Sequence, residues 1–284
     1  MGVAAACGSS KTGSSGQSNG STTSGPTGAT GGNLAALLPL FDLNSLRIGV
    51  PQRFVFGLGD DQGVVLKSGP ATLSIEFLDA NNAPLGPAIS AVRHNQAIPR
   101  AYWPVTTTIP KFGTYTARAV VGPQNLDQAI QVTANSTVPA AGDKLPPLDT
   151  PTTKNAQGVQ QVCTRDPVCP LHDITLHDAL ALGKPVAFLV GTPAYCQTGV
   201  CGPVLEVLLG EYAKRKGTMH FLHAEVYKEV YKDQNTPTSP TVDALTLTYE
   251  PALFLAGADG VIRERLDILY DAAELGPALD RLTA

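Results

Sequence analysis

The sequence has few charged side chains, and they are neither clustered nor strongly of one sign. Charged residues make up 15% of the 284 positions, with 20 basic against 24 acidic side chains and a formal net charge of -4. Proteins that bind nucleic acid present clusters of Lys and Arg, so we expect no nucleic-acid partner. The chain also lacks a run of about eighteen consecutive apolar residues, the length that a helix needs to cross a bilayer. The sequence therefore predicts no transmembrane helix.

Cysteine is scarce, with five residues, but its distribution is informative. Cys7 stands alone, while Cys163, Cys169, Cys196 and Cys201 lie together in the second half of the chain. Four cysteines at these spacings suggest two pairs, with one residue left over. Disulfides persist in oxidising compartments and are rare in the cytosol. We therefore expect an exported, extracytoplasmic protein.

Residues 1–38 are predicted to be a flexible tether. Gly, Ser, Thr and Asn dominate residues 8–33, and such a composition buries too little apolar surface to become ordered. Residues 3–7 read Val-Ala-Ala-Ala-Cys, which resembles the lipobox of bacterial lipoproteins. That resemblance implies a lipid on Cys7 and an anchor at a membrane surface of the bacterial cell envelope. Only six residues precede Cys7, fewer than a signal peptide needs. We expect either a true start upstream of Met1 or an incidental cysteine in a flexible cytosolic tail.

Residues 39–135 are predicted to form an antiparallel β-sandwich. Short β-rich runs alternate there with turn residues; the runs are 53–58, 71–78, 102–109 and 114–121. The unit Gly113-Thr114-Tyr115 resembles the corner before the penultimate strand of immunoglobulin-like domains, which implies a related architecture without their cysteines. We expect Trp103 to pack in this core. The sequence leaves the role of the sandwich open.

Residues 136–160 are rich in Pro, Thr and Ala and are predicted to be an extended linker. Residues 161–284 alternate between helix and strand patterns, which predicts an α/β domain. A helix capped by Thr175 precedes an apolar strand at 186–190. A helix at 203–216 and a strand at 218–226 complete a βαβ unit. The rest is a short helix at 242–247, a hairpin of strands at 252–255 and 261–268, and a final helix capped by Asp271.

This order of elements closely resembles the thioredoxin family over residues 161–284, with a cysteine pair at the first strand-to-helix turn and a proline opening the later hairpin. The resemblance implies that Cys196 is the attacking thiol, that Cys201 resolves, and that Pro251 is a cis-proline facing the thiol. Tyr195 occupies the aromatic position before the first cysteine. The placement suits the chemistry, because a thiolate attacks disulfides and a helix amino terminus stabilises its charge.

Two features depart from that family. Four residues separate Cys196 from Cys201 where the family usually has two, so the turn must be irregular or partly unwound to let the pair bond. Gly199 makes that deformation easier. The buried acid of the preceding strand is also missing, since residues 188–190 are apolar. Glu250 is one candidate to approach the thiol, where a carboxylate would raise the thiol pKa; a solvated side chain that points away is the alternative.

The spacing of Cys196 and Cys201 also resembles the bacterioferritin-comigratory type of peroxiredoxin, in which the resolving cysteine follows five positions after the peroxidatic one. That resemblance implies peroxide reduction at Cys196. Thr192 lies four residues before Cys196, whereas the active-site Thr of that family lies three before its cysteine.

The other pair lies in a proline-containing loop that reads Cys163-Thr-Arg-Asp-Pro-Val-Cys169-Pro-Leu-His172. We expect a structural disulfide between Cys163 and Cys169. The alternative is a metal site, which would add His172 and a fourth ligand from His177, His220 or His223. We assign no metal and no cofactor.

Three hypotheses about function follow from the sequence. The first is thiol–disulfide exchange by a membrane-tethered thioredoxin-like domain, whose partners would be the thiols or disulfides of exported proteins and an unidentified redox partner. The second is a redox-inert binding lipoprotein in which both cysteine pairs are structural. The third is a peroxide reductase that depends on Cys196. The sequence does not determine the direction of exchange.

Overall fold

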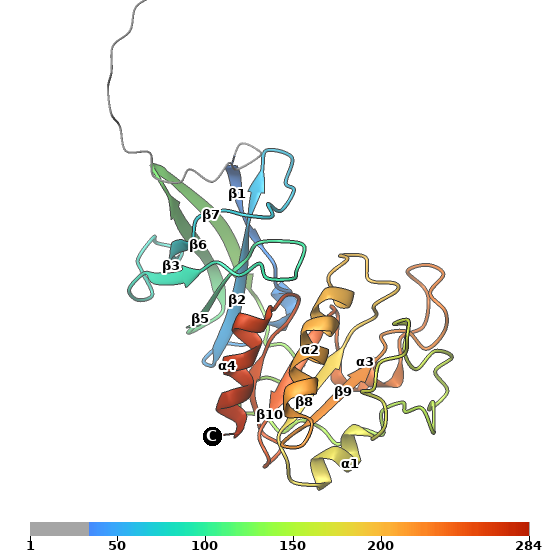
Figure 1. The fold of residues 1–284 in the computed structure, drawn as a ribbon. Helices are drawn as coiled ribbons and strands as arrows, with labels where there is room; N and C mark the ends of the chain where they lie inside the picture. Colours follow the sequence, from blue (N-terminus) through green and yellow to red (C-terminus); the bar gives the residue numbers. More distant parts are fainter. Residues whose placement is uncertain (1–33, 284) are drawn as a thin grey trace, which may run out of the picture.

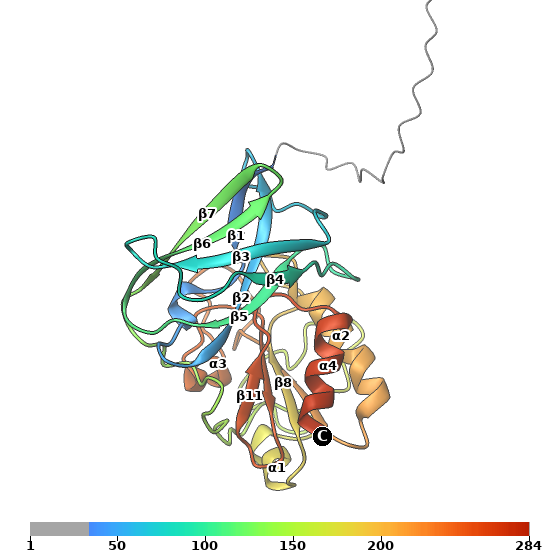
Figure 2. The same cartoon turned by 90° about the vertical axis from the view of Figure 1, so that its left-hand side faces the viewer.

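The computed structural model describes residues 34–283, which form a β-rich amino-terminal region and a mixed α/β carboxy-terminal region (Figure 1, Figure 2). The predictions about Cys7 and about the tether up to residue 33 lie outside these residues. Between residues 34 and 283, no helix is long and apolar enough to cross a bilayer.

The predicted tether is wrong for its last residues. Leu34–Pro39 form the first strand, β1, which pairs antiparallel with β2 (Pro51–Asp60). The apolar sequence Leu-Ala-Ala-Leu-Leu explains the difference, because Leu37 contributes to a hydrophobic core and is only 2% exposed. Burial of such a side chain offsets the entropy lost on ordering the segment.

Seven strands of the amino-terminal region form two antiparallel sheets, of order β1-β2-β5 and β4-β3-β6-β7. The remaining bounds are β3 (Thr72–Leu78), β4 (Ile89–Val92), β5 (Trp103–Thr108), β6 (Gly113–Val121) and β7 (Gln124–Val132), with a 3-10 turn, η1, at Leu43–Ser45. The four predicted strands are confirmed as β2, β3, β5 and β6. The sequence did not predict β1, β4 or β7.

Side chains of both sheets meet in one hydrophobic core. Phe54 on one sheet contacts Phe77 on the other edge to face, with ring centroids 5.1 Å apart. Trp103 is fully buried there, and its Nε1 donates to the carbonyl of Pro70 at 3.2 Å, which confirms the prediction that it packs in the core. At the entry to β6, the Tyr115 hydroxyl donates to the carbonyl of Lys111 at 2.8 Å.

The segment 133–160 has no helix and no strand of its own, as predicted for a linker. It is nevertheless packed against the carboxy-terminal region. Val138 and Leu145 are buried among that region's apolar side chains, and the Leu145 amide donates to the carbonyl of Gly260 at 2.9 Å. Asp143 pairs with Arg47 of the amino-terminal region. The segment therefore fastens the two regions together and is not a free spacer.

The carboxy-terminal region has a four-stranded sheet of order β11-β10-β8-β9. Strands β8 and β9 are parallel, and β10 runs antiparallel to β8 and to β11. The bounds are α1 (Leu176–Ala181), β8 (Val186–Val190), α2 (Cys201–Arg215), β9 (His220–Ala224), α3 (Pro240–Leu245), β10 (Ala252–Ala256), β11 (Ile262–Arg265) and α4 (Ala272–Thr283). Every helix and strand predicted in this region is present.

The alternation of side chains along β8 explains how helices cover both faces of this sheet. Phe188 and Val190 point into a core with α1 and α3, while Ala187 and Leu189 point into a second core with α2 and α4. All five residues of β8 are buried, as expected for a strand covered on both faces. Helices α2 and α4 accordingly lie side by side in both views (Figure 1, Figure 2).

Strands β2 and β5 bring the amino-terminal region against the start of α4. The Arg53 side chain is only 7% exposed and pairs with Glu274 at 2.7 Å. The Tyr102 hydroxyl donates to Glu274 at 2.6 Å and accepts the amide of Asp271 at 2.9 Å. Burial, and then the Glu274 carboxylate, raise the pKa of Tyr102, so that hydroxyl keeps its proton and stays a donor.

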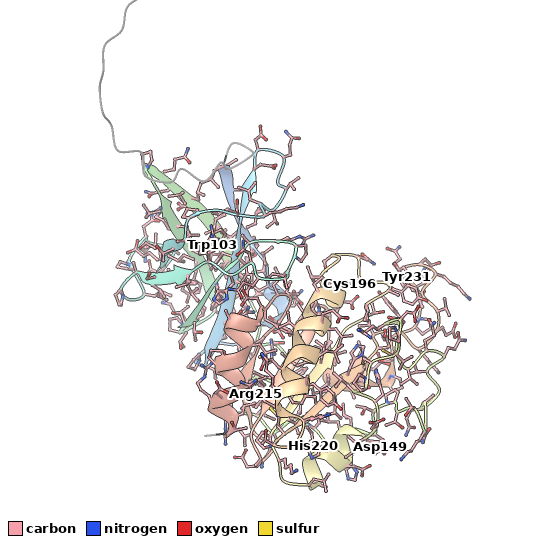
Figure 3. All side chains as sticks on the ribbon, viewed as in Figure 1. Trp103, Asp149, Cys196, Arg215, His220 and Tyr231 are labelled. Carbon is pink, nitrogen blue, oxygen red and sulfur yellow. A yellow bond between two sulfur atoms is a disulfide. The ribbon has the colours of Figure 1, made fainter. Side chains whose placement is uncertain are left out.

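An apolar contact beside these polar groups reaches the loop that carries Cys196. Val55 and Tyr102 pack with Val200 and Leu269 in one buried cluster, and Cys196 lies against it. Figure 3 shows Cys196 at the end of α2 that faces the amino-terminal region. The β-rich region thus forms one wall beside this cysteine.

Candidate redox and thiol–imidazole sites

Cys196 and Cys201 form a disulfide at the junction of β8 and α2, with their Cα atoms 5.9 Å apart. Helix α2 begins at Cys201, so Cys196 lies in the preceding loop and not in the first helical turn. Gly199 takes a positive φ of 69°, a conformation that glycine adopts without strain. The predicted unwinding of this turn is therefore confirmed, and it is what lets residues five apart approach each other.

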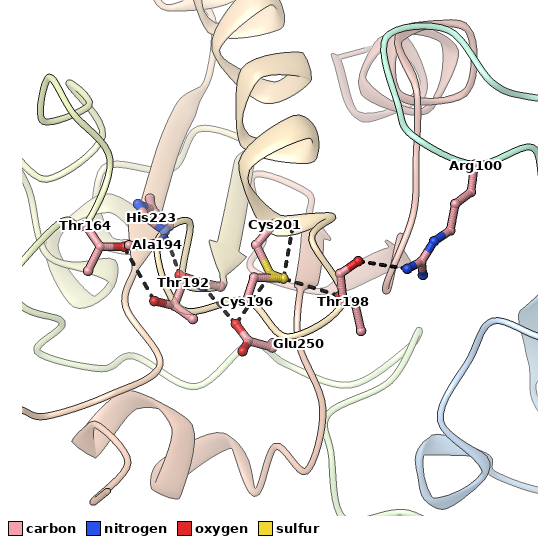
Figure 4. Close-up of a disulfide and its surroundings, with 10 residues drawn as sticks. Arg100, Thr164, Thr192, Ala194, Cys196, Thr198, Cys201, His223 and Glu250 are labelled. Atoms are coloured by element: carbon pink, nitrogen blue, oxygen red, sulfur yellow. Dashed lines mark hydrogen bonds between the residues drawn. A yellow bond between two sulfur atoms is a disulfide. The ribbon is translucent and has the colours of Figure 1, made fainter. Parts of the chain in front are cut away.

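The two sulfur atoms differ in their surroundings. Cys201 is only 1% exposed, whereas Cys196 is half-buried. The amide of Cys201 donates to Cys196 Sγ at 3.2 Å, and the Thr198 hydroxyl lies 3.3 Å from the same sulfur (Figure 4). A thiolate at Cys196 would therefore receive a hydrogen bond from the first amide of a 15-residue helix, an arrangement that lowers a thiol pKa.

Pro251 follows a cis peptide bond, as the resemblance implied. Gly191 lies between this proline and the disulfide: a Cβ built on Gly191 would be 3.2 Å from Pro251 Cβ and 3.8 Å from Cys201 Cβ. The structure therefore brings Pro251 close to the buried cysteine, with only a glycine between them. A larger residue at position 191 would need one of these neighbours to move.

Glu250 is the acidic group of this site. Its carboxylate accepts the amide of Thr192 at 2.9 Å and lies 3.4 Å from Cys201 Sγ. Burial raises the pKa of Glu250 to about 7, against the lowering effect of the Thr192 amide. Of the two positions that the sequence left open for Glu250, the one close to the cysteine pair is therefore the one observed. The carboxylate contacts Cys201, however, and not the attacking thiol Cys196 that the sequence analysis had considered.

Tyr195 is held beside the disulfide and joins an aromatic cluster. Its hydroxyl donates to Gln161 Oε1 at 2.8 Å, and its ring centroid lies 5.8 Å from that of Tyr231. Tyr227 completes the cluster, 4.7 Å from Tyr231 by centroid. Sequence analysis missed Tyr227 and Tyr231, because they lie in an irregular loop after β9 where no periodicity marks them.

A second group of sulfur and nitrogen atoms lies at the edge strand β9. Cys163 Sγ and Cys169 Sγ are 3.7 Å apart, with no bond between them. His172 Nε2 lies 3.2 Å from Cys169 Sγ, and His223 Nδ1 lies 3.6 Å from Cys169 Sγ and 3.9 Å from Cys163 Sγ. The structure thus does not contain the structural disulfide expected between Cys163 and Cys169. The two sulfur atoms face the imidazoles of His172 and His223 instead.

Of the three histidines considered as a fourth ligand, only His223 joins this group. His177 is exposed and faces Asp178 at 3.3 Å. His220 pairs with Val186 at the opposite end of β9 (Figure 3). Strand geometry explains the choice, because β9 places His223 under the loop that carries the two cysteines: the His223 amide donates to the carbonyl of Leu171 at 3.0 Å.

Residues 191 and 192 lie between the two centres. His223 Nε2 contacts the carbonyl of Gly191 at 2.9 Å, and the next amide, of Thr192, donates to Glu250. The Thr192 and Thr164 hydroxyls lie 3.4 Å apart, and Thr164 accepts the amide of Ala194 at 3.1 Å (Figure 4). The loop 161–172 therefore holds the backbone that leads into Cys196.

No family model matches the chain, and no curated protein matches it. Among solved structures, a chain described as "DsbH Oxidoreductase" aligns with 49% of this chain and 91% of its own length, at 16% identity and a TM-score of 0.28. Similarity at this level assigns neither fold nor function to this chain. Both are therefore inferred from the geometry of the site.

Proposed function

We propose that residues 161–284 form a thioredoxin-like domain that carries out thiol–disulfide exchange through Cys196 and Cys201. The observation that supports this most directly is the asymmetry of the pair, with a half-buried Cys196 that accepts a helix amide and a buried Cys201 beside a carboxyl. The sheet order, the helix that starts at the second cysteine and the cis bond before Pro251 agree with that fold.

In the reducing direction, the Cys196 thiolate attacks one sulfur of a client disulfide, and the other client sulfur leaves as a thiolate. Cys201 then loses its proton to the Glu250 carboxylate and attacks Cys196 Sγ, which releases the second client thiolate and closes the Cys196–Cys201 disulfide. Two electrons pass to the client. The oxidising direction is the same sequence reversed, with protonated Glu250 returning the proton to Cys201.

Glu250 suits this role because its pKa of about 7 lies near the pH at which exported proteins work, where a proton acceptor and donor are both populated. It faces the resolving thiol, 3.4 Å away, and has no hydrogen bond to Cys196. The negative charge of the carboxylate therefore opposes ionisation mainly at Cys201, while the helix amide favours it at Cys196.

The aromatic cluster of Tyr195, Tyr227 and Tyr231 offers a surface for a client chain. The three rings are half-buried and contact one another. Tyr195 directly precedes Cys196, and Tyr231 lies on the side of Cys196 that faces away from the β-rich region (Figure 3). Aromatic rings give contact area at low entropy cost, and extended segments of exported proteins with exposed cysteines would supply apolar side chains for it.

The amino-terminal region is proposed to be an immunoglobulin-like sandwich that positions this domain. Two sheets share one core, and the Tyr115 hydroxyl closes a corner on the backbone four residues upstream, which is the arrangement of a tyrosine corner. We further propose that lipidation of Cys7 anchors the chain in the bacterial envelope. Metabolic labelling with palmitate, compared between the wild-type gene with its natural upstream sequence and Cys7→Ser, tests that anchor.

The exchange activity is tested by equilibrating the full chain in glutathione buffers of graded potential and mapping its free thiols by mass spectrometry. We expect Cys196 and Cys201 to titrate together between about -270 and -120 mV, the range of exchange proteins. Cys196→Ser should abolish the reduction of an insulin disulfide. A pair that stays oxidised at every potential would favour the redox-inert lipoprotein instead. Rapid, Cys196-dependent loss of hydrogen peroxide would favour a peroxide reductase.

A further inference from the structure

We propose that Cys163, Cys169, His172 and His223 form a structural zinc site that fastens the loop 161–172 to strand β9. The ligand atoms would be the two sulfurs, His172 Nε2 and His223 Nδ1, which all lie within 4.8 Å of one another. All four side chains are withdrawn from solvent, and three of them are buried. This site is separate from the redox pair and does not depend on the proposed exchange activity.

The distances between these atoms fit one tetrahedrally coordinated ion. Zinc bonds of about 2.3 Å to sulfur and about 2.05 Å to nitrogen give tetrahedral edges of about 3.8 Å for S···S, about 3.3 Å for N···N and about 3.6 Å for S···N. The observed S···S separation is 3.7 Å and the N···N separation is 3.2 Å. Three of the S···N separations are 3.2, 3.6 and 3.9 Å.

The hydrogen bonds around the group leave the right atoms free to bind a cation. His223 Nε2 lies 2.9 Å from the Gly191 carbonyl, which can only accept, so this nitrogen carries the proton. His223 Nδ1 then presents a lone pair to His172 Nε2 and to the two sulfurs. A bound ion would replace these contacts with four metal–ligand bonds once the two thiols have lost their protons. The contact with Gly191 also orients the imidazole, as ligand histidines require.

The identity and charge of the donors select zinc. Two thiolates and two neutral imidazoles neutralise a divalent ion, and mixed sulfur–nitrogen tetrahedra are typical of Zn²⁺. Binding converts two thiols to thiolates and releases two protons to solvent. Four protein ligands fill the tetrahedron and leave no position for water, so the site is structural and not catalytic.

The position of the four ligands indicates what a bound zinc ion would stabilise, namely the packing of the loop 161–172 against strand β9. Strand β9 is an edge of the sheet, and the loop 161–172 covers it through the bond from the His223 amide to Leu171. The same loop supports the approach to Cys196 through Thr164 and through Gln161, which accepts the Tyr195 hydroxyl. Zinc would hold this cover in place in a segment that has no helix or strand of its own.

The test is the metal content of the full-length chain, purified without chelator and without reductant. We expect about one zinc per chain by elemental analysis, and near-complete loss of zinc in Cys169→Ser and in His223→Gln. The matched control is His220→Gln, which changes a histidine of the same strand outside the group and should keep the zinc. The double variant Cys196→Ser/Cys201→Ser should also keep it, which separates this site from the redox pair.

A spectroscopic measurement covers the case in which these variants fail to fold. Cobalt(II) added to the metal-free wild-type chain should give thiolate charge-transfer absorption in the near ultraviolet and the intense visible bands of tetrahedral cobalt, and zinc should abolish both. Wild-type chain that binds neither ion, or that carries a Cys163–Cys169 disulfide when isolated, would overturn the proposal. So would zinc that is retained in His223→Gln or lost from the Cys196→Ser/Cys201→Ser variant.

Discussion

The two cysteine pairs of the carboxy-terminal region lie on either side of residues 191 and 192, but their neighbours differ. Cys196 and Cys201 are bonded to each other, next to a carboxyl and a helix amide. Cys163 and Cys169 are unbonded and face two imidazoles. A spacing of five or six residues therefore does not decide the chemistry of a cysteine pair. The groups that the fold brings up to the sulfur atoms decide it.

The two cysteine pairs are distinguished most clearly by a variant that changes only the redox pair. Cys201→Ser should remove the resolving step and leave Cys196 linked to its client, so turnover falls to the uncatalysed background and a mixed disulfide accumulates. Mass spectrometry of the trapped species measures this effect. Zinc content should stay unchanged in the same variant. Trapping through Cys163 or Cys169 would reverse the roles that we assign to the two pairs.

The thiol–imidazole group should contribute more to the stability of the fold than the Cys196–Cys201 disulfide does. Because the thiol–imidazole group closes a loop over an edge strand, removing zinc with a chelator should lower the melting temperature by about 5 to 10 °C, equivalent to about 2 to 3 kcal/mol for a chain of this size. Opening the Cys196–Cys201 disulfide, which closes a loop of only a few residues, should lower it by less. Differential scanning calorimetry of the two treatments compares them directly. A melting temperature that does not change when zinc is removed would mean that the thiol–imidazole group does not support the loop.

Glu250→Gln should slow the step that involves Cys201 without affecting the metal. Loss of a positioned proton acceptor costs about 10- to 100-fold here, and the rate of disulfide closure should lose its inflection near pH 7. Stopped-flow measurement of mixed-disulfide resolution between pH 5 and 9 gives both quantities. Thr198→Ala, which removes a hydroxyl on the Cys196 side, is the control and should keep the inflection.

Glu250→Gln should also change the stability of the fold, and the direction of the change follows from the raised pKa of Glu250. Glu250 ionises at about 7 in the fold and at 4.5 as a free side chain, so its protonated form stabilises the fold below about pH 4.5. That contribution is lost as the pH rises through about 7. At pH 8 the neutral variant should therefore be more stable than the wild type by about 1 to 3 kcal/mol, after allowance for its partial exposure. A wild type that is the more stable at pH 8 would contradict this.

The sequence predicts the redox pair better than the thiol–imidazole group, for a physical reason. Cys196, Cys201 and Pro251 occur at fixed points of a strand–helix–strand pattern, and local periodicity reveals that pattern. His223 reaches Cys163 across 60 residues, and only the pairing of β9 with β8 decides that His223 and not His220 lies under the loop. The contact of Glu250 with Cys201 is likewise set by tertiary packing. The tyrosines after β9 carry no periodic signal at all.

The edge strands β4 and β7 of the amino-terminal region were likewise missed, because tertiary pairing and not local sequence defines them. β4 spans four residues, and β7 reads Gln-Asn-Leu-Asp-Gln-Ala-Ile-Gln-Val, in which polar residues outnumber apolar ones. β4 pairs with β3 and β7 pairs with β6. A strand held by its neighbour leaves little trace in its own composition.

The smallest effect that we predict is a change in the rate of disulfide reduction when the contact between the β-rich region and the loop that carries Cys196 is weakened. Tyr102 makes two hydrogen bonds to the start of α4 and packs against Val200. Tyr102→Phe leaves the Asp271 amide and the Glu274 carboxylate without that partner and should cost about 1 to 3 kcal/mol. Because a loosened contact exposes the loop 196–200 more often, reduction of the disulfide by a small thiol should become about two- to five-fold faster.

Tyr115→Phe is the matched control for this change, since it removes one hydroxyl from the same region, where the partner is the carbonyl of Lys111 and not a group of α4. It should lower the stability of the sandwich and leave the rate of disulfide reduction and the zinc content unchanged. Thiol-trapping kinetics on both variants measure the difference. If the two variants speed reduction equally, general destabilisation controls access to Cys196, and the contact of Tyr102 with Val200 does not. If neither does, the β-rich region does not govern the reactivity of the pair that lies against it.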